Sequence, residues 1–321
     1  MRKLLVGFCL TAGLALAGGE AAAQNYPDRP IKMFVGFGPG SSTDISARIV
    51  AKGMEEKLGQ PVVVENRPGA GGSIAAAAAA AAPKDGYTLL WTPSSVTVFQ
   101  ELYPLNTFVA EKDLQPIGGA AAGTLVMLVR NDPSITLNGL LARARTSPTA
   151  VTFASGGVGS NAHLATVVMG KAVGAEFLHI PYKSSTAATT DLLAGQVDFL
   201  FDALTASLPF IRSGQVKALG VSAGRRSSFL PDVPTIAEAG VPGYEHSFWL
   251  GVSAPAGTPR PIVDKLSDVL FGIVSAPSFR AEIGKVGMEP FPLRSAELQS
   301  RIASDTQAWK KKLAGVNFKP E

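Results

Sequence analysis

Short apolar segments alternate with segments of helical periodicity along almost the whole chain, and this alternation is what most restricts the fold. Residues 31–35 (IKMFV) predict a buried strand, and the apolar residues of 45–58 recur at a helical period before Gly59, a typical helix terminator. The pattern repeats, so further strands are predicted at 61–65, 87–91, 124–129, 151–154, 177–180, 197–201, 217–222 and 248–254. Strand–helix–strand units of this kind indicate an α/β protein with parallel sheets and right-handed crossovers.

Local signals place the ends of several predicted helices. Ser73 precedes the alanine tract 75–82, so we expect a thin helix that is capped by Ser73 and ended by Pro83. Thr258 followed by Pro259 predicts the start of a helix over 259–275. Other helices are predicted near 136–146, through His163 to Gly174, up to Gly195, and over 278–286 and 295–314.

The strand–helix series occurs twice, which predicts two lobes. The helices after residue 254 come with too few strands for a third domain, so we expect them to return to the first lobe. We therefore assign residues 24–127 and 250–321 to lobe 1 and residues 128–249 to lobe 2. The strands at 124–129 and 248–254 then connect the lobes, and two lobes joined by two strands form a hinged clamp.

The first 23 residues have the pattern of a secretory signal peptide. Arg2 and Lys3 precede the uncharged apolar stretch 4–18, and small residues lead to a predicted cleavage position after Ala23. The apolar stretch is shorter than the roughly 20 residues of a membrane-spanning helix, so export to the periplasm is favoured over a retained anchor. Cleavage also removes Cys9, the only cysteine, and leaves a mature chain without a thiol or a disulfide.

The charge pattern argues against a nucleic-acid partner. The full chain has a net charge of +4, but its charges are spread out, and its one basic run, 310–312, ends a predicted helix, where cations are favoured. His163, His179 and His246 lie far apart and lack the short spacing of a zinc site, so no metal is expected. We also expect a monomer.

Ligands of open parallel sheets bind outside the carboxyl ends of the strands. Here those ends lead into loops that are rich in glycine, serine, threonine and asparagine and poor in charge. Several of the loops begin helices, where main-chain N–H groups and the helix dipole favour an anion, and none combines a nucleophile with its base. The loops, which are 38–44, 66–72, 92–95, 155–161, 181–185 and 202–207, therefore predict a binding site and not a reaction centre.

The segment VGFGPGSSTD (35–44) has a second interpretation as a dinucleotide-binding turn, because its glycines follow a strand and Glu65 ends the next strand. However, Ser41 replaces the last glycine of that pattern and Pro39 stiffens the turn. An exported chain is also separated from the nicotinamide pool of the cell. A carboxylate is therefore the expected ligand of this loop.

The segment GVSAG (220–224) matches the nucleophile elbow of serine hydrolases, with Ser222 as the nucleophile. That elbow leads directly into a helix, whereas RRSSFLPDVP with its two prolines follows here, and only His246 lies downstream as a base. An exported hydrolase is thus the alternative from another class of protein. We expect Ser222 at a strand end, beside a loop on the hinge side.

Several single residues allow two interpretations. His163, in the first turn of a predicted helix, can donate a hydrogen bond to a ligand or orient its own loop, whereas His179 is expected in the core. Asp44 can neutralise a helix start and Asp202 can cap the helix that follows it, or each can line a ligand cleft.

An ordered set of motifs extends over essentially the whole mature chain: YPDRPIKMFVGFGPGSSTD, NRPGAGG, GSNAHLA, HIPYKSS, LLAGQVDFLFDAL, LPDVPTIAEAGVPGYE and SAPAGTP. Together they resemble the Bug family of periplasmic solute-binding receptors, which serve tripartite tricarboxylate transporters. The resemblance implies a two-lobed type II periplasmic-binding-protein fold, with two Rossmann-like βαβ domains joined by two crossing strands. It also implies hinged capture of a small organic carboxylate, delivery to membrane transporter subunits, and no catalysis or organic cofactor.

The resemblance also implies which residues hold the ligand: the first Gly-rich loop, the loop before His163, and cleft positions on three other strands. The candidates are Phe37, Gly38, Gly40, Ser41, Ser42, Asp44, Ser94, Ser95, Ser155, Ser160, Asn161, His163, Tyr182 and Asp202. The chain departs from the commoner family pattern at 36–42, where GFGPGSS stands in place of a Pro-Phe-Pro-Ala-Gly-Gly type of loop, and at Ser184-Ser185, where a Gly pair is frequent. A di-, tri- or aromatic carboxylate and an amino acid all fit, and a sensor that presents its ligand to a signalling partner is the alternative to transport.

Overall fold

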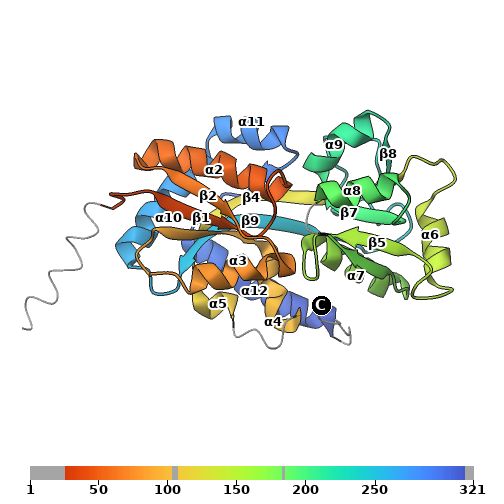
Figure 1. The fold of residues 1–321 in the computed structure, drawn as a ribbon, viewed down its shortest axis with the longest axis horizontal. Helices are drawn as coiled ribbons and strands as arrows, with labels where there is room; N and C mark the ends of the chain where they lie inside the picture. Colours follow the sequence, from red (N-terminus) through yellow and green to blue (C-terminus); the bar gives the residue numbers. More distant parts are fainter. Residues whose placement is uncertain (1–25, 103–107, 183–184, 315–321) are drawn as a thin grey trace, which may run out of the picture.

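The computed structural model describes residues 26–102, 108–182 and 185–314. The predicted signal peptide and Ser184 lie outside these residues. The chain forms two α/β lobes side by side, and the second lobe is the green part of Figure 1. The strands follow one path of neighbours in the order β2-β1-β3-β9-β4-β7-β5-β6, with β8 and β10 also paired to β4.

The first lobe combines the beginning of the described chain with its end. Its strands are β1 (Ile31–Val35), β2 (Val62–Asn66), β3 (Thr88–Pro93), β9 (Ser247–Pro255) and β10 (Glu289–Pro290). Its helices are α2 (Ser42–Leu58), α3 (Ser73–Ala80), α4 (Phe99–Leu102), α5 (Ala110–Asp113), α10 (Arg260–Val274), α11 (Pro277–Lys285) and α12 (Ser295–Leu313). Two short 3-10 helices, η1 (Ala70–Gly72) and η2 (Ser94–Val98), follow strands β2 and β3.

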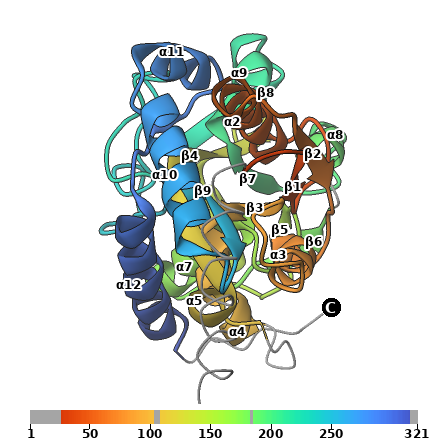
Figure 2. The same ribbon diagram turned by 90° about the vertical axis from the view of Figure 1, so that its left-hand side faces the viewer.

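Helices cover both faces of the sheet in the first lobe. Side chains that alternate along β1 enter two different clusters, because successive residues of a strand point to opposite faces. Met33 packs in the cluster with α2 and α10, and Phe34 packs in the cluster with α3 and α12. Figure 2 shows α2 above and α3 below the strands β1 and β3.

The second lobe is built from the middle of the chain. Its strands are β5 (Thr152–Ser155), β6 (Leu178–Pro181), β7 (Phe199–Ala203) and β8 (Val216–Val221), and its helices are α6 (Leu137–Ala144), α7 (Asn161–Val173), α8 (Ser185–Leu193) and α9 (Leu204–Arg212). Apolar residues of α6 and α7 pack with Phe153 and Phe199, and those of α8 and α9 pack with Ala154 and Leu200. The lobe is therefore also a helix–sheet–helix arrangement.

Strand β4 (Leu114–Arg130) belongs to both lobes. Residues 114–124 pair with β9, and residues 125–130 pair with β7 and β8. The predicted strand at 124–129 was therefore too short, since β4 begins ten positions earlier, where small residues predict a strand poorly. Those small residues are needed for packing, because an ideal Cβ on Gly119 would lie 2.6 Å from the carbonyl oxygen of Phe291.

The predicted parallel pairing holds within each lobe, and the strands at the centre of the molecule pair antiparallel. Strand β4 runs antiparallel to β7, β8 and β9, and β9 runs antiparallel to β3. The outer strands β1, β2 and β3 pair in parallel, as do β5, β6 and β7. Each lobe therefore keeps its predicted βαβ units and adds antiparallel strands where the chain passes between the lobes.

Some predicted helix ends are correct and others are wrong. Gly59 and Gly174 adopt the left-handed conformation directly after α2 and α7, as their positions predicted. Ser73 is the first residue of α3 and does not cap it, since Gly72 is the cap residue. Thr258 does not cap α10 either, because Pro259 takes that position and the Thr258 hydroxyl donates to the carbonyl of Pro255 at 2.8 Å.

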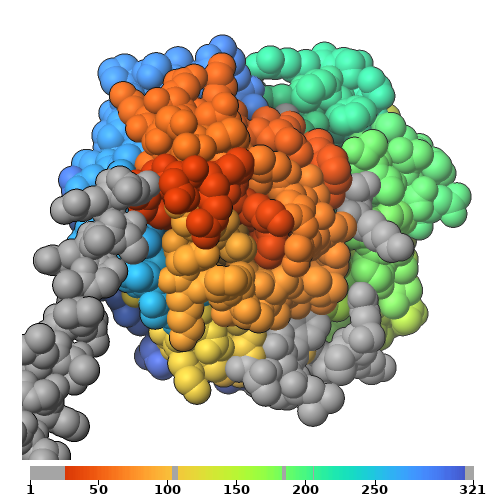
Figure 3. All heavy atoms as spheres, turned by 60° about the vertical axis from the view of Figure 1, so that its left-hand side comes forward, coloured from red at the N-terminus to blue at the C-terminus, as the bar shows by residue number. Residues whose placement is uncertain are grey.

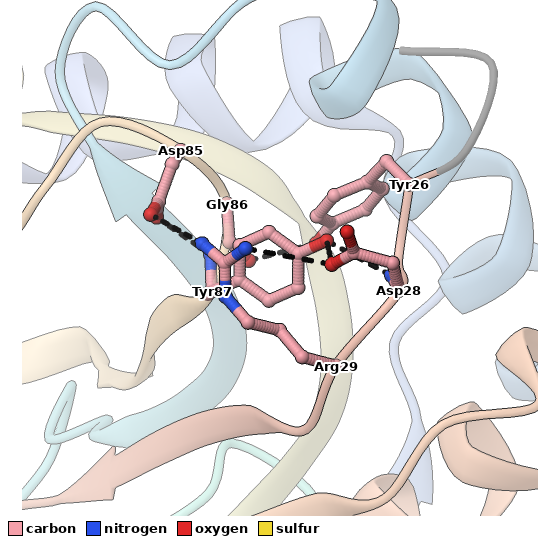
Figure 4. A network of polar contacts seen from close by, with 6 residues as sticks. All are labelled: Tyr26, Asp28, Arg29, Asp85, Gly86 and Tyr87. Atoms are coloured by element: carbon pink, nitrogen blue, oxygen red, sulfur yellow. Dashed lines mark hydrogen bonds and ion pairs between the residues drawn. The ribbon is translucent and has the colours of Figure 1, made fainter. Parts of the chain in front are cut away.

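The beginning of the described chain is fastened to the first lobe by the network in Figure 4. The Tyr26 hydroxyl donates to the carbonyl of Gly86 at 2.7 Å, and the Tyr87 hydroxyl donates to Oδ1 of Asp28, also at 2.7 Å. Arg29 lies over the Tyr87 ring, 3.7 Å from its centroid, and pairs with Asp85 at 3.1 Å. These contacts hold the segment just after the predicted signal peptide on the lobe.

Candidate functional site

The loop between β1 and α2 is held in shape by Asp44. Its buried carboxylate accepts hydrogen bonds from the Gly40 N–H at 2.9 Å and the Asn66 amide at 2.8 Å, and it pairs with Arg48 at 3.0 Å. Ser41 caps α2 by accepting the N–H of Asp44 at 3.2 Å. Asp44 therefore organises the loop.

Two opposing effects act on the pKa of the Asp44 carboxyl. Burial works to raise it, but hydrogen bonds from Arg48, Asn66 and Gly40 outweigh burial and hold the pKa below its usual value. The charge of Asp44 is thus compensated inside the loop.

Sequence reasoning missed Asn66 and Arg48 as supports of this loop. The Asn66 amide donates both to the carbonyl oxygen of Phe37 at 2.9 Å and to Asp44, and it joins two strand–helix loops. The position of Arg48, four residues after Asp44 on one helix face, was a usable signal. For Asn66 the sequence indicated only a place at the start of the loop 66–72, because its hydrogen-bond partners lie far away in the sequence.

In the rest of the first Gly-rich loop, the N–H and carbonyl groups of the main chain are the polar groups near Phe37 and Gly38. Gly38 is buried and its carbonyl oxygen accepts the N–H of Ser41 at 3.3 Å, while Phe37 is half-buried. Ser42 is the first residue of α2.

In the second lobe, the loop between β5 and α7 is held by two histidines. Nδ1 of His163 accepts the N–H of Gly159 at 3.2 Å, so this ring orients the loop, as one of its two interpretations predicted. Nε2 of His179 lies 2.6 Å from Oγ of Ser155, which also bonds the main chain of Gly157. His179 is only half-buried, so the expectation of a core residue is too strong.

Both rings are held neutral. Burial, followed by the influence of His179, lowers the pKa of His163 to about 3, and burial lowers the pKa of His179 to about 4. A neutral His163 that accepts at Nδ1 carries its proton on Nε2. Ser160 completes the loop by capping α7, since its Oγ accepts the N–H of His163 at 3.3 Å.

Both the first Gly-rich loop and η2 meet the segment between β5 and α7 across the lobes. The Ser94 hydroxyl at the start of η2 donates to Oδ1 of Asn161 at the start of α7, over 3.1 Å. Phe37 lies against Gly156, since an ideal Cβ on that glycine would be 3.7 Å from the Phe37 ring. Figure 3 shows the orange surface of the first lobe and the green surface of the second side by side. Ser94 and Ser95 lie in a 3-10 helix, which corrects the predicted loop over 92–95.

Three other candidates differ in what their polar atoms do. The Tyr182 hydroxyl donates to Asp191 at 2.6 Å, and burial together with Asp191 raises its pKa to about 12. Asp202 lies within β7 and accepts the N–H of Ala203, which is itself the cap residue of α9, so Asp202 is not the predicted helix cap. Oγ of Ser95 is buried and has no hydrogen-bond partner among the described residues.

Ser222 is not placed to act as a nucleophile. It is fully buried, and its hydroxyl donates to the main-chain carbonyl of His246 at 2.7 Å instead of facing the imidazole. Its Oγ also accepts the N–H of Leu125 at 2.9 Å. The residue joins the crossing in β4 to the segment that enters β9, which agrees with its predicted place at a strand end on the hinge side.

A surface hollow lies beside this crossing, away from the candidate ligand residues. Its lining includes Gly123, Arg225, Glu245 and Glu289, and Arg225 pairs with Glu289 at 3.2 Å. None of the predicted ligand residues lines it.

In the described part of the chain, no group of three or more histidine, cysteine or acidic residues is placed to hold a metal ion. The helices described here also include none with the length and apolar character needed to span a bilayer.

Comparison with known proteins decides the family. Residues 46–317 match the family model described as tripartite tricarboxylate transporter family receptor, TctC. The chain belongs to this family. It is 37% identical to Protein BugT of Bordetella pertussis over 94% of this chain and 93% of that protein.

Two solved structures are similar to this TctC-family chain over most of its length. The periplasmic binding protein BugD is 34% identical, with a TM-score of 0.84, over 92% of this chain and 100% of that one. The R. palustris protein Rpa4515 with adipate is 31% identical, with a TM-score of 0.85, over 90% of this chain and 98% of that one. The predicted two-lobed periplasmic-binding-protein fold and Bug-type relationship are confirmed, and membership of a receptor family argues against the hydrolase alternative.

Proposed function

We propose that this TctC-family receptor captures a small organic carboxylate between its lobes and delivers it to the membrane subunits of a tripartite tricarboxylate-type transporter. Two contacts between donor-rich segments of opposite lobes carry the proposal: the Ser94–Asn161 hydrogen bond of 3.1 Å, and Phe37 of the first Gly-rich loop against Gly156 of the loop before α7. Main-chain N–H groups and hydroxyls at the starts of α2 and α7 supply neutral donors that suit an anion. The negative charge of Asp44 repels an anionic ligand only weakly, because Arg48 pairs with the Asp44 carboxylate at an N–O distance of 3.0 Å.

The ligand contacts belong to the same proposal. We assign them to the predicted residues of the two loops and of η2, with Ser95 as the donor of greatest interest. Its hydroxyl is buried without a hydrogen-bond partner among the described residues, which destabilises the folded chain. A ligand that accepts a hydrogen bond from this hydroxyl removes that cost. In a 3-10 helix, residues three apart lie on one face, so Ser95 shares a face with Val98. Val98 packs with Leu164 of α7, which places that face toward the second lobe.

The relatives support the class of ligand. The adipate that accompanies the R. palustris structure is a dicarboxylate, so we favour di- and tricarboxylates as the first ligands to test for this chain. Export, cleavage after Ala23 and a monomeric state complete the proposal. The lobe boundaries remain a prediction, and strand pairing favours junctions near Thr124 and Ser247.

Thermal-shift screening of the chain that begins at Gln24 tests this function. A ligand that binds only the folded state adds about 2.7 kcal/mol at a hundredfold excess over its Kd, which raises the melting temperature by several degrees. The panel contains adipate, malate, citrate, benzoate and aspartate. We expect at least one of these carboxylates to raise the melting temperature, and a panel without any shift would contradict the proposal.

Two neighbouring serines provide a matched test of the contacts. We expect Ser95→Ala to keep or raise the melting temperature of the unliganded chain, because the lost hydroxyl has no partner there, and to reduce the ligand-induced shift. Ser94→Ala removes the hydrogen bond to Asn161, so it weakens the lobe contact as well. A full ligand-induced shift in Ser95→Ala would remove that residue from the ligand site.

A further inference from the structure

The loop between β2 and α3 touches the opposite lobe through a glycine. An ideal Cβ built on Gly71 would lie 2.3 Å from the carbonyl oxygen of Val158 and 3.0 Å from both the carbonyl carbon of Gly159 and the N atom of Ser160. These three atoms belong to the loop between β5 and α7 of the second lobe. The distance of 2.3 Å is far below any contact that a methyl group makes, so no side chain fits at this position.

The atoms that surround Gly71 are main-chain atoms, which cannot rotate away. The contact also includes Gly157, whose ideal Cβ would lie 3.5 Å from the main-chain N of Gly71. The same second-lobe loop ends at Ser160, the cap of α7, and the next residue, Asn161, accepts a hydrogen bond from the Ser94 hydroxyl. An added Cβ could therefore be accommodated only by separating the loops, and the loops are the parts of each lobe that face each other.

We propose that Gly71 is the residue that permits full closure of the two lobes, and that its missing side chain sets ligand affinity without any contact to the ligand. The inference rests on the proposed function, because it concerns closure around the ligand. A receptor that binds its ligand in the closed state has an apparent Kd equal to the intrinsic Kd divided by the closed fraction. A Cβ at Gly71 lowers the closed fraction and thereby weakens binding. Gly71 is thus a positioning residue for the clamp.

Backbone strain needs its own control, because Gly71 has a φ of +61°. Gly174, at the end of α7, has a φ of +63°, and an ideal Cβ there meets nothing within 4 Å. Gly71→Ala and Gly174→Ala therefore introduce the same strain, and only the first blocks the lobe contact. Gly71→Asn is a second variant with a Cβ, and asparagine tolerates a positive φ better than alanine does.

The experiment measures the distance between the lobes. The predicted mature chain has no cysteine, so Lys57→Cys in α2 and Arg212→Cys in α9, both exposed, allow one spin label on each lobe. Distance distributions are recorded by electron–electron double resonance without ligand and at saturating adipate, for the otherwise unchanged chain and for each glycine variant. Adipate titration supplies the apparent affinity.

We expect Gly71→Ala and Gly71→Asn to lose the short-distance population that the parent chain and Gly174→Ala show, and to bind adipate about tenfold more weakly or worse. The inference would be overturned if Gly71→Ala and Gly174→Ala gave the same distributions of the distance between the labels. It would also be overturned if the parent chain showed no short-distance population, either without ligand or at saturating adipate. A loss of affinity with normal closure at saturating adipate would also overturn it, since that result indicates a direct ligand contact. If adipate and the other carboxylates do not bind but the glycine variants still lose the closed population, the proposed function fails while the closure role stands.

Discussion

Ser222 and His246 are joined by a hydrogen bond from the serine hydroxyl to the histidine main-chain carbonyl, at 2.7 Å. The bond connects the end of β8 to the segment that enters β9, and Oγ of Ser222 accepts the N–H of Leu125 in β4 as well. Both chain passages between the lobes therefore meet at one buried hydroxyl. A hinge needs such a fixed point, because the lobes can rotate only where few contacts change.

Replacement of Ser222 by alanine should destabilise the protein without removing an enzymatic activity. The variant leaves the N–H of Leu125 and the carbonyl of His246 buried without their partner, which costs about 2–4 kcal/mol of unfolding free energy. Urea unfolding measures the loss. Ser300→Ala, on the exposed side of α12, is the control and should stay within about 0.5 kcal/mol of the parent chain. A Ser222→Ala variant as stable as that control would contradict the assigned role.

Asp44→Asn should lower stability at neutral pH and have less effect in acid. The pKa of Asp44 is lower in the folded chain than in the unfolded chain, so its contribution is present above the unfolded pKa of about 4 and is lost as the pH falls through the folded pKa. We expect a loss of about 1–3 kcal/mol at pH 7, measured by urea unfolding. The difference between the two proteins should shrink below pH 4.

An exposed pair with the same spacing is the matched control. Arg260 and Asp264 also lie four residues apart on a helix, at 2.8 Å, but the Asp264 side chain is 50% exposed. Asp264→Asn should therefore cost less than about 1 kcal/mol, because solvent screens such pairs. Equal losses for the two variants would show that burial of Asp44 adds nothing.

His246→Phe should change the pH dependence of stability. Burial, with a smaller effect of Lys312, lowers the pKa of His246 to about 3, and its Nε2 has no partner among the described residues. Between pH 6.5 and the folded pKa, the unfolded chain binds a proton that the folded chain does not, so the parent chain loses stability as the pH falls.

The expected size follows from the slope of about 1.4 kcal/mol per pH unit for one group. The unfolding free energy of the variant minus that of the parent chain should be about 2 kcal/mol larger at pH 5 than at pH 8. Unfolding free energies at the two pH values give this comparison directly. An unchanged difference would mean that His246 takes up a proton in the folded state.

Much of the local structure could be predicted because its causes lie within a few residues. Gly59 and Gly174 end their helices by adopting a left-handed conformation that other residues adopt with difficulty. The donor-rich loops after β1 and β5 could be located because each follows an apolar strand and precedes a helix. The predicted cap at Ser73 failed because Gly72 takes the cap position, and Gly72 packs against a distant segment, since an ideal Cβ on Gly36 would lie 2.6 Å from the Gly72 Cα.

By itself, the sequence determined the two series of strands and helices, the loops that carry the donors, and the family to which the chain belongs. Only the tertiary structure decided that β4 passes through both lobes, that Asn66 supports Asp44, and that Gly71 of the first lobe meets Val158 of the second. The physical reason is distance along the chain. Periodicity and helix caps depend on neighbouring residues, whereas a shared hydrogen bond or a close approach of two main chains depends on segments that only folding brings together.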